Sequence, residues 1–155
     1  NPNWALASTP YDTWSTVTYS LGAEADRSDD PDGDGYDNEF EYFFGMDPTD
    51  SSNQGVNKAP ASASVVDVTG TLYPAIEFSY RNDGSVTSYE VESSADLIDW
   101  TTIAPQDALA PTSYTIVPPG PTDNGDNTST LKIRYNTDFS LLPGNHLFMR
   151  IKATE

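Results

Sequence analysis

The chain has 155 residues, of which 24 are acidic and 7 are basic, and its formal net charge at pH 7 is −17. This balance argues against nucleic-acid binding, which requires a basic surface. Because there is no cysteine, disulfides and thiolate metal sites are excluded, and no apolar run approaches the ~18 residues of a membrane span. The length suits one ordinary domain, or a small domain with an appendage.

The N-terminal residues 1–9 are mostly small or polar, and Trp4 is their only aromatic residue. Thr9 and Pro10 then predict a helix start, with Thr9 as the N-cap and Pro10 at the first helical position. Apolar residues at helical spacing follow, namely Tyr11, Trp14, Val17 and Leu21. The predicted helix ends at Gly22.

The next stretch, Asp30 to Glu41, has the pattern of a twelve-residue calcium loop. Such a loop takes oxygen ligands from positions 1, 3, 5, 7, 9 and 12, position 7 through its backbone carbonyl, and it has glycine at position 6, here Gly35. The residues at the ligand positions are Asp30, Asp32, Asp34, Tyr36, Asn38 and Glu41. Residues 39–44 predict a short exiting helix that ends at Gly45. The alternative to a calcium site is an acidic, disordered turn.

Charge around this loop supports the calcium interpretation. Residues 23–50 hold 11 acidic residues and one basic residue. Such concentrated negative charge repels itself unless a cation lies within it. In a chain without disulfides, bound calcium stabilises the fold in their place, and calcium is abundant outside the cell. We therefore expect a secreted or cell-surface protein, of which this chain is a processed or excised piece, with Ca²⁺ as its cofactor.

From about residue 61 onward the apolar pattern has a period of two, which is typical of strands. A short apolar run lies at residues 65–66, alternating runs lie around residues 76–80, 89–92, 131–135 and 147–152, and turn residues separate them. Six or seven short strands predict an antiparallel β-sandwich of immunoglobulin or fibronectin type III size. The predicted fold class is thus mostly β, with a helix–calcium loop–helix segment over residues 1–55 and the sandwich over residues 56–155.

Two segments carry a resemblance to known proteins. Asp30 to Glu41 followed by Tyr42-Phe43-Phe44-Gly45-Met46-Asp47-Pro48-Thr49 resembles the calcium segment found near the C-termini of secreted proteins from Verrucomicrobia, Planctomycetes and related bacteria, which is akin to thrombospondin type 3 repeats and dockerin half-repeats. Residues 89–100 resemble the strand and turn "YxVExSxDLxxW" of the β-domain that follows there, and residues 148–152 its closing strand. Met46 departs from the usual threonine at a position that is not a ligand. The resemblance implies an accessory, non-catalytic role.

The sequence offers little for catalysis, and we expect no enzyme. Thiol chemistry is excluded, the single histidine, His146, lies beside a Pro-Gly turn, and there is no Gly-x-Ser-x-Gly motif. Carboxylate pairs for glycoside cleavage remain open, but most acidic residues lie in the calcium loop.

Aromatic and basic residues are the candidates for a ligand surface. Aromatic faces stack on sugar rings, and the alternative role for each ring is core packing. Four of the basic residues lie on the polar faces of two strands, where they suit either an anionic polysaccharide or cross-strand pairing with Glu77, Glu90 and Glu92. The candidate residues are Trp4, Tyr73, Tyr114, Lys132, Arg134, Arg150 and Lys152.

Three functions follow as expectations. The first is an accessory module that binds a polysaccharide or a cell-surface component. The second is a structural subunit of a calcium-dependent extracellular assembly or filament, in which residues 1–8 add a strand to a neighbour's sheet edge. The third is a sorting or anchoring domain.

Overall fold

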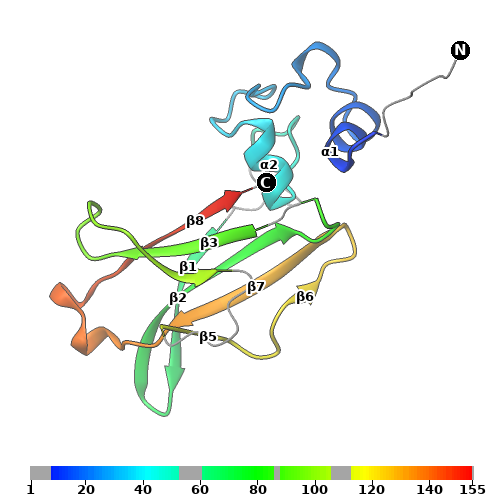
Figure 1. Cartoon of the computed structure of the whole chain (residues 1–155). Helices are drawn as coiled ribbons and strands as arrows, with labels where there is room; N and C mark the ends of the chain where they lie inside the picture. Colours follow the sequence, from blue (N-terminus) through cyan, green and yellow to red (C-terminus); the bar gives the residue numbers. More distant parts are fainter. Residues whose placement is uncertain (1–7, 53–60, 86–87, 106–112, 155) are drawn as a thin grey trace, which may run out of the picture. The chain divides into compact units, whose positions relative to one another are not determined.

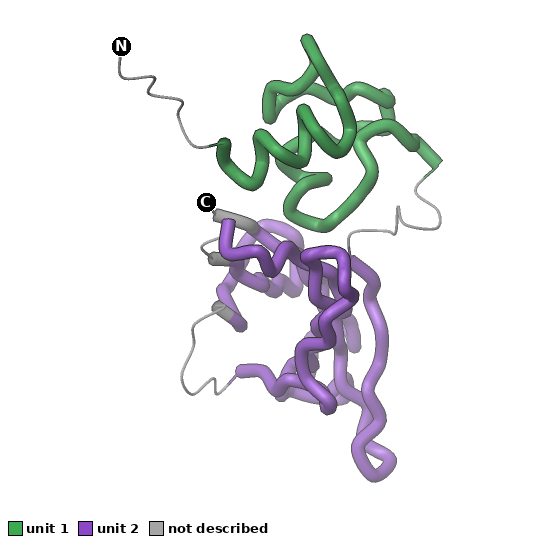
Figure 2. The backbone as a smooth tube through the Cα atoms, turned by 90° about the vertical axis from the view of Figure 1, so that its right-hand side faces the viewer, with its two compact units in different colours: residues 1–58 green, residues 59–155 purple. Residues whose placement is uncertain are grey.

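The structure is a computed structural model of the whole chain, and it describes residues 8–52, 61–85, 88–105 and 113–154. The chain divides into two compact units, unit 1 (Asn1–Lys58) and unit 2 (Ala59–Glu155) (Figure 2). The described part of unit 1 is helical and irregular, whereas that of unit 2 is built from strands (Figure 1). The expectation of a mostly β chain with antiparallel sheets and short helices is confirmed. Trp4 lies outside the described residues.

Unit 1 begins with a capped helical turn. The Thr9 hydroxyl accepts the backbone N–H of Asp12 at 3.1 Å, and the Asp12 carboxylate accepts the N–H of Thr9 at 2.9 Å. This reciprocal pair is a capping box, with Pro10 at the first helical position as predicted. α1 (Pro10–Asp12) continues directly into the π-helix η1 (Thr13–Thr18), in which Tyr19 donates its N–H to the Trp14 carbonyl five residues earlier.

The wider turn of η1 changes which side chains are buried. Trp14 is buried, but Val17, three residues later, is 73% exposed, because a π-helix rotates each residue by less than an α-helix does. The aromatic rings of Tyr11, Trp14 and Tyr42 instead form the buried cluster of unit 1, with centroids 5.3–5.5 Å apart. Burial raises the pKa of Tyr11 to about 12, and its hydroxyl donates to the Ala25 carbonyl.

We expect Thr9→Ala to destabilise unit 1 by about 1 kcal/mol, since the first turn would lose its side-chain cap. Urea unfolding followed by the near-ultraviolet circular dichroism of the aromatic cluster measures this change. Val17→Ala is the matched control, because a highly exposed side chain contributes less than about 0.5 kcal/mol. Equal unfolding midpoints for Thr9→Ala and Val17→Ala would contradict the role of the cap.

The second helix of unit 1, α2 (Asn38–Phe44), follows the acidic loop. Asp37 caps its start by accepting the N–H of Phe40 at 2.9 Å, and Gly45 ends it in the left-handed region at φ 71°. The predicted exiting helix and its glycine stop are therefore confirmed. A single-turn 3₁₀ helix, η2 (Gly22–Glu24), lies between η1 and the loop.

Unit 2 consists of two antiparallel sheets (Figure 1). The first sheet has the order β1-β2-β7-β5, and β6 also pairs with β7. Its strands are β1 (Ala61–Val68), β2 (Thr71–Arg81), β5 (Tyr114–Ile116), β6 (Thr122–Asp123) and β7 (Thr128–Tyr135). The second sheet has the order β4-β3-β8, with β4 (Thr101–Pro105), β3 (Ser88–Ser94) and β8 (Phe148–Thr154). Two 3₁₀ turns, η3 (Phe139–Leu141) and η4 (Pro143–Asn145), precede β8.

The core of unit 2 lies between the two sheets. Phe78 of β2 packs edge-on against Tyr89 of β3, with ring centroids 5.3 Å apart. Their neighbours Ile133 of β7 and Val91 of β3 are 1% and 0% exposed. Alternate residues along each strand point away from this core, so the polar residues of the alternating pattern lie on the outer faces.

Candidate metal centre

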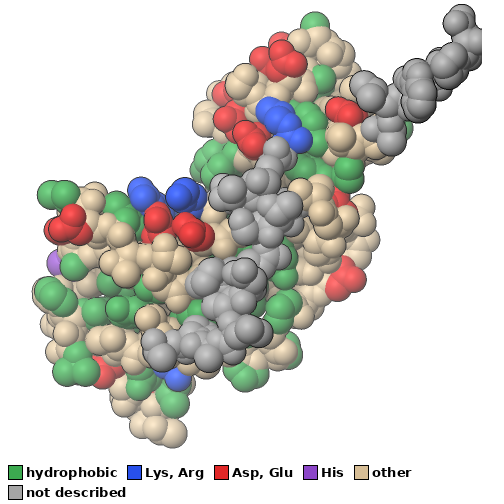
Figure 3. All heavy atoms as spheres, viewed as in Figure 1, with side chains coloured by type: hydrophobic (Ala, Val, Ile, Leu, Met, Phe, Trp, Pro, Cys, Tyr) green, Lys and Arg blue, Asp and Glu red, His purple; other side chains and the backbone are tan. Residues whose placement is uncertain are grey.

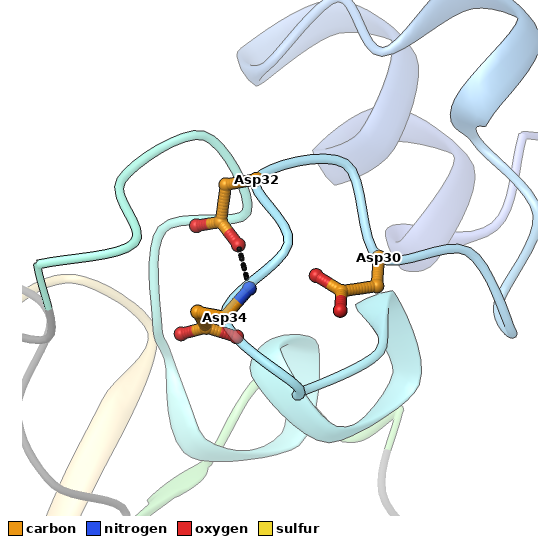
Figure 4. Close-up of side chains that lie close together, drawn as sticks. All are labelled: Asp30, Asp32 and Asp34. Atoms are coloured by element: carbon orange, nitrogen blue, oxygen red, sulfur yellow. Dashed lines mark hydrogen bonds between the residues drawn. The ribbon is translucent and has the colours of Figure 1, made fainter.

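Three aspartates of the acidic loop come together in unit 1. Asp30, Asp32 and Asp34 each place a carboxylate oxygen within 4.8 Å of the others (Figure 4). Like charges at this distance repel, so the arrangement needs a counter-charge to persist. All the donors are oxygens, and hard cations prefer oxygen ligands. The cluster could therefore hold a metal ion.

Backbone amides of the loop orient these carboxylates. Asp30 accepts the N–H groups of Gly33 at 2.9 Å and Gly35 at 3.0 Å. Asp32 accepts the N–H of Asp34 at 3.1 Å, the bond drawn in Figure 4. Gly33 and Gly35 adopt φ 76° and 96°, which glycine tolerates without strain. The second carboxylate oxygens of Asp32 and Asp34 are buried without a hydrogen-bond partner among the described residues.

Glu41 of α2 adds a fourth carboxylate. It is 0% exposed, and both of its carboxylate oxygens are buried without a hydrogen-bond partner among the described residues. Burial, together with the charges of Asp32 and Asp34, raises the pKa of Glu41 to about 8. Burial likewise raises the pKa of Asp32. Folded proteins bury a carboxylate only with a partner, and a bound cation would supply the missing partner for all of these oxygens.

Asn38 connects the loop to the preceding chain. Its side chain is fully buried, and its amide nitrogen donates to the carbonyls of Glu24 at 2.8 Å and Asp26 at 2.7 Å. Its own backbone N–H donates to the Asp29 carbonyl at 2.8 Å. The Asn38 side-chain oxygen has no partner among the described residues. The twelve-residue pattern predicts Asn38 as a ligand. It gives no sign of the two hydrogen bonds from the Asn38 side-chain nitrogen to the Glu24 and Asp26 carbonyls, which we call the Asn38 clamp.

Asp47 is a further carboxylate close to Glu41, whose pKa its charge helps to raise. It follows the left-handed turn at Gly45, and its side chain accepts both the N–H and the hydroxyl of Thr49. The loop pattern ends at Glu41, and the sequence leaves two roles open for Asp47, a further contact to the ion or a cap at the helix end. Of the other predicted ligands, Tyr36 stacks its ring on that of Phe40, with ring centroids 4.6 Å apart. Ligation by the Tyr36 backbone carbonyl stays a prediction.

The basic residues proposed for a ligand surface are divided between the sheets of unit 2. Lys132 and Arg134 lie on β7 of the first sheet, and Arg150 and Lys152 lie on β8 of the second. Each contacts an acidic or aromatic side chain of its own sheet, so blue and red side chains adjoin in Figure 3. The contacts are Lys132–Glu77 at 3.5 Å, Lys152–Glu90 at 3.7 Å, Arg150–Glu92 at 2.6 Å, Arg134 over the Tyr73 ring at 4.4 Å and Arg150 over the Trp100 ring at 4.0 Å.

The remaining candidates differ in accessibility. Tyr114 is 6% exposed in the core of unit 2, where burial raises its pKa. Tyr73 is half-buried beneath Arg134. His146 is exposed, and its two ring nitrogens lie 3.2 Å and 3.1 Å from the carbonyls of Gly144 and Ala95.

No family model matches this chain, and comparisons with curated proteins and with solved structures give no match either. Among the described residues, no helix combines the length and the apolar character needed to cross a membrane.

Proposed function

We propose that this chain is a non-catalytic, calcium-stabilised module of an extracellular protein. The observation that carries the proposal is Glu41, a fully buried carboxylate with no hydrogen-bond partner among the described residues, next to three clustered aspartates. Calcium takes six to eight oxygen ligands at about 2.3–2.6 Å, and a glutamate at the last loop position supplies two of them. The proposed ligands are the six residues of the loop pattern: Asp30, Asp32, Asp34, Tyr36, Asn38 and Glu41.

Two features support calcium over other cations. The donors are carboxylates and an amide oxygen, with neither cysteine nor histidine in the loop, which disfavours zinc and copper. The loop offers more oxygens than magnesium uses, because magnesium retains several of its waters.

We further propose that the two antiparallel sheets of unit 2 form a sandwich of the immunoglobulin or fibronectin type III kind.

We expect calorimetric titration of the metal-free chain to give one Ca²⁺ site per chain. Magnesium should bind at least about tenfold more weakly, because the loop cannot contract to its small octahedral shell without cost. Titration with zinc is the control for nonspecific binding to the acidic surface. Heat signals of equal size and affinity for all three cations would contradict a built calcium site.

We also propose that the module serves its parent protein by binding a polysaccharide or a cell-surface component. Support comes from Tyr73 and Trp100, two half-buried rings of unit 2 that each stack against an arginine. In affinity electrophoresis through polysaccharide-containing gels, we expect selective retardation that Tyr73→Ala or Trp100→Ala reduces. Phe148→Ala, which removes an exposed ring of β8, is the control. Unretarded migration in neutral and anionic gels would contradict this role.

A further inference from the structure

The outer face of the first sheet of unit 2 carries more basic than acidic residues. Phe78 contacts the second sheet through Tyr89, so Phe78 lies on the inner face, and the residues that alternate with it along β2 point outward. Cross-strand partners point to the same side of a sheet. The charged residues that the strands of this sheet place on the outer face are therefore Glu77, Arg81, Lys132 and Arg134. In a chain of net charge −17, this face is locally positive.

Three of the four basic candidates for a ligand surface are already neutralised. Each lies 3.7 Å or less from a carboxylate of the neighbouring strand, and the pairs are Lys132–Glu77, Arg150–Glu92 and Lys152–Glu90. An anionic ligand at any of these cations would compete with a carboxylate that the sheet holds in place. The pairing leaves the outer face of the second sheet with balanced charge, which disfavours an anion site there.

Arg134 is the exception among these candidates. Among the described residues, its guanidinium has neither a carboxylate partner nor a hydrogen-bond acceptor, and its contact is with the Tyr73 ring, 4.4 Å from the centroid. The side chain is half-buried, so the ring and the sheet limit the directions in which it can point. A guanidinium has five N–H donors in a fixed fork. Those donors are available to a ligand that approaches the outer face.

The surroundings of Arg134 supply an aromatic ring and hydroxyl groups. β7 lies between β2 and β5 in the first sheet (Figure 1), and Arg134 is opposite Ala75 on one side and Thr115 on the other. Tyr73 follows Ala75 along the outer face of β2, and its hydroxyl has no hydrogen-bond partner among the described residues. The Thr115 hydroxyl donates to the Asn136 side-chain oxygen at 2.7 Å and keeps its acceptor capacity. A cation, a ring and two hydroxyls thus share one face.

This combination suits a sugar that carries an anionic group. The planar fork of arginine binds an oxyanion through two parallel hydrogen bonds, which lysine cannot do. An aromatic side chain offers an apolar surface to a sugar ring and a polar group at its edge. An acidic sugar has its anionic group attached to the ring itself. One sugar residue can therefore hydrogen-bond to Arg134 and contact the Tyr73 side chain together.

We propose that Arg134 and Tyr73 bind an acidic polysaccharide on the outer face of the first sheet, with the anionic group of the ligand on the Arg134 guanidinium. This inference rests on the polysaccharide-binding role proposed above and names its ligand class. Uronate carboxylates and sulfate esters share the required oxyanion chemistry. Because the net charge of the chain opposes a polyanion and salt screens that repulsion beyond about 10 Å, the short-range contacts at this face decide binding.

Affinity electrophoresis of the full chain in calcium tests the ligand class. The gels contain hydroxyethyl, carboxymethyl or sulfated cellulose, which share one backbone and differ in charge, and the corresponding three dextrans repeat the test on a second backbone. We expect binding at least about tenfold tighter in an acidic gel than in its neutral counterpart, and the carboxylate and sulfate gels identify the anionic group. Retardation in neutral gels alone would overturn the acidic ligand and leave the polysaccharide role intact. Unretarded migration in every gel would contradict both.

Variants of β7 test the site. Arg134→Gln should weaken binding to the acidic polysaccharide at least about tenfold, because it removes a charged bidentate donor. Arg134→Lys, which keeps the charge and loses the fork, should restore only part of the affinity. Lys132→Gln is the matched control. It removes the same charge from the same face of β7, but Lys132 is paired with Glu77, so we expect a loss of less than about threefold.

Equal losses for Arg134→Gln and Lys132→Gln would overturn the site, because they would show that only the net charge of the face attracts the ligand. Unchanged retardation of Arg134→Gln in the acidic gels would also overturn it, while the polysaccharide role would stand. Polyglutamate at equal carboxylate concentration is the competitor that lacks a sugar, and we expect it to leave the retardation unchanged. Full displacement by polyglutamate would overturn the assignment to a sugar.

Discussion

Glu41→Gln should weaken calcium binding at least about 100-fold, because loss of a ligand exceeds the ~10–100-fold cost of changing an outer-shell partner. The same substitution should stabilise the calcium-free protein. Burial and the neighbouring aspartates raise the pKa of Glu41 to about 8, so folding without calcium has to protonate this side chain or bury its charge, whereas glutamine is neutral already. A substitution that weakens calcium binding and yet stabilises the calcium-free protein identifies the substituted residue as a calcium ligand. Calorimetric titration measures the affinity, and urea unfolding in chelator measures the stability.

Glu39→Gln is the matched control for this experiment. It removes the same charge from the same helix, but Glu39 is exposed and lies 3.8 Å from Arg27. We expect it to change the calcium affinity less than about tenfold, through screened long-range charge alone. Equal losses for Glu39→Gln and Glu41→Gln would show that the loop attracts cations only by its net charge.

Asn38→Ala should destabilise unit 1 by roughly 2–4 kcal/mol, with and without calcium. The substitution removes the donor to two carbonyls, those of Glu24 and Asp26, and leaves a small cavity. Urea unfolding followed by near-ultraviolet circular dichroism measures the loss. Asn82→Ala is the control, because Asn82 is exposed and its side-chain amide donates at 2.8 Å to the Ser129 hydroxyl rather than to two buried carbonyls. Equal stability of the two variants would contradict the clamp.

The helix and the loop of unit 1 were predictable to different degrees. α2 and its end at Gly45 follow from local signals, an Asp cap and a left-handed glycine, which act within a few residues. The π-helix η1 does not follow from local signals, because the spacing of Trp14 and Val17 suits an α-helix. Packing of the aromatic cluster determines its wider turn. The Asn38 clamp joins residues 12 and 14 positions apart, beyond the reach of a spacing argument.

In unit 2 the long strands were predictable and their neighbours were not. β2 and β7 alternate apolar and polar residues over residues 76–80 and 131–135, which identifies them directly. β5 and β6 have three and two residues, too few to establish a period. Which strands lie at the sheet edges has no sequence signal, because edge position depends on how all the strands pair.

Amide hydrogen exchange of the full chain, with calcium and with chelator, shows whether bound calcium stabilises the loop and α2. If calcium fills the site, chelation should accelerate exchange by more than about tenfold in the loop and α2, residues 29–45, because the carboxylates would repel without their counter-charge. The buried strands β2, β3 and β7 of unit 2 serve as the internal reference and should exchange at unchanged rates. Identical exchange of residues 29–45 in calcium and in chelator would contradict the calcium-stabilised module.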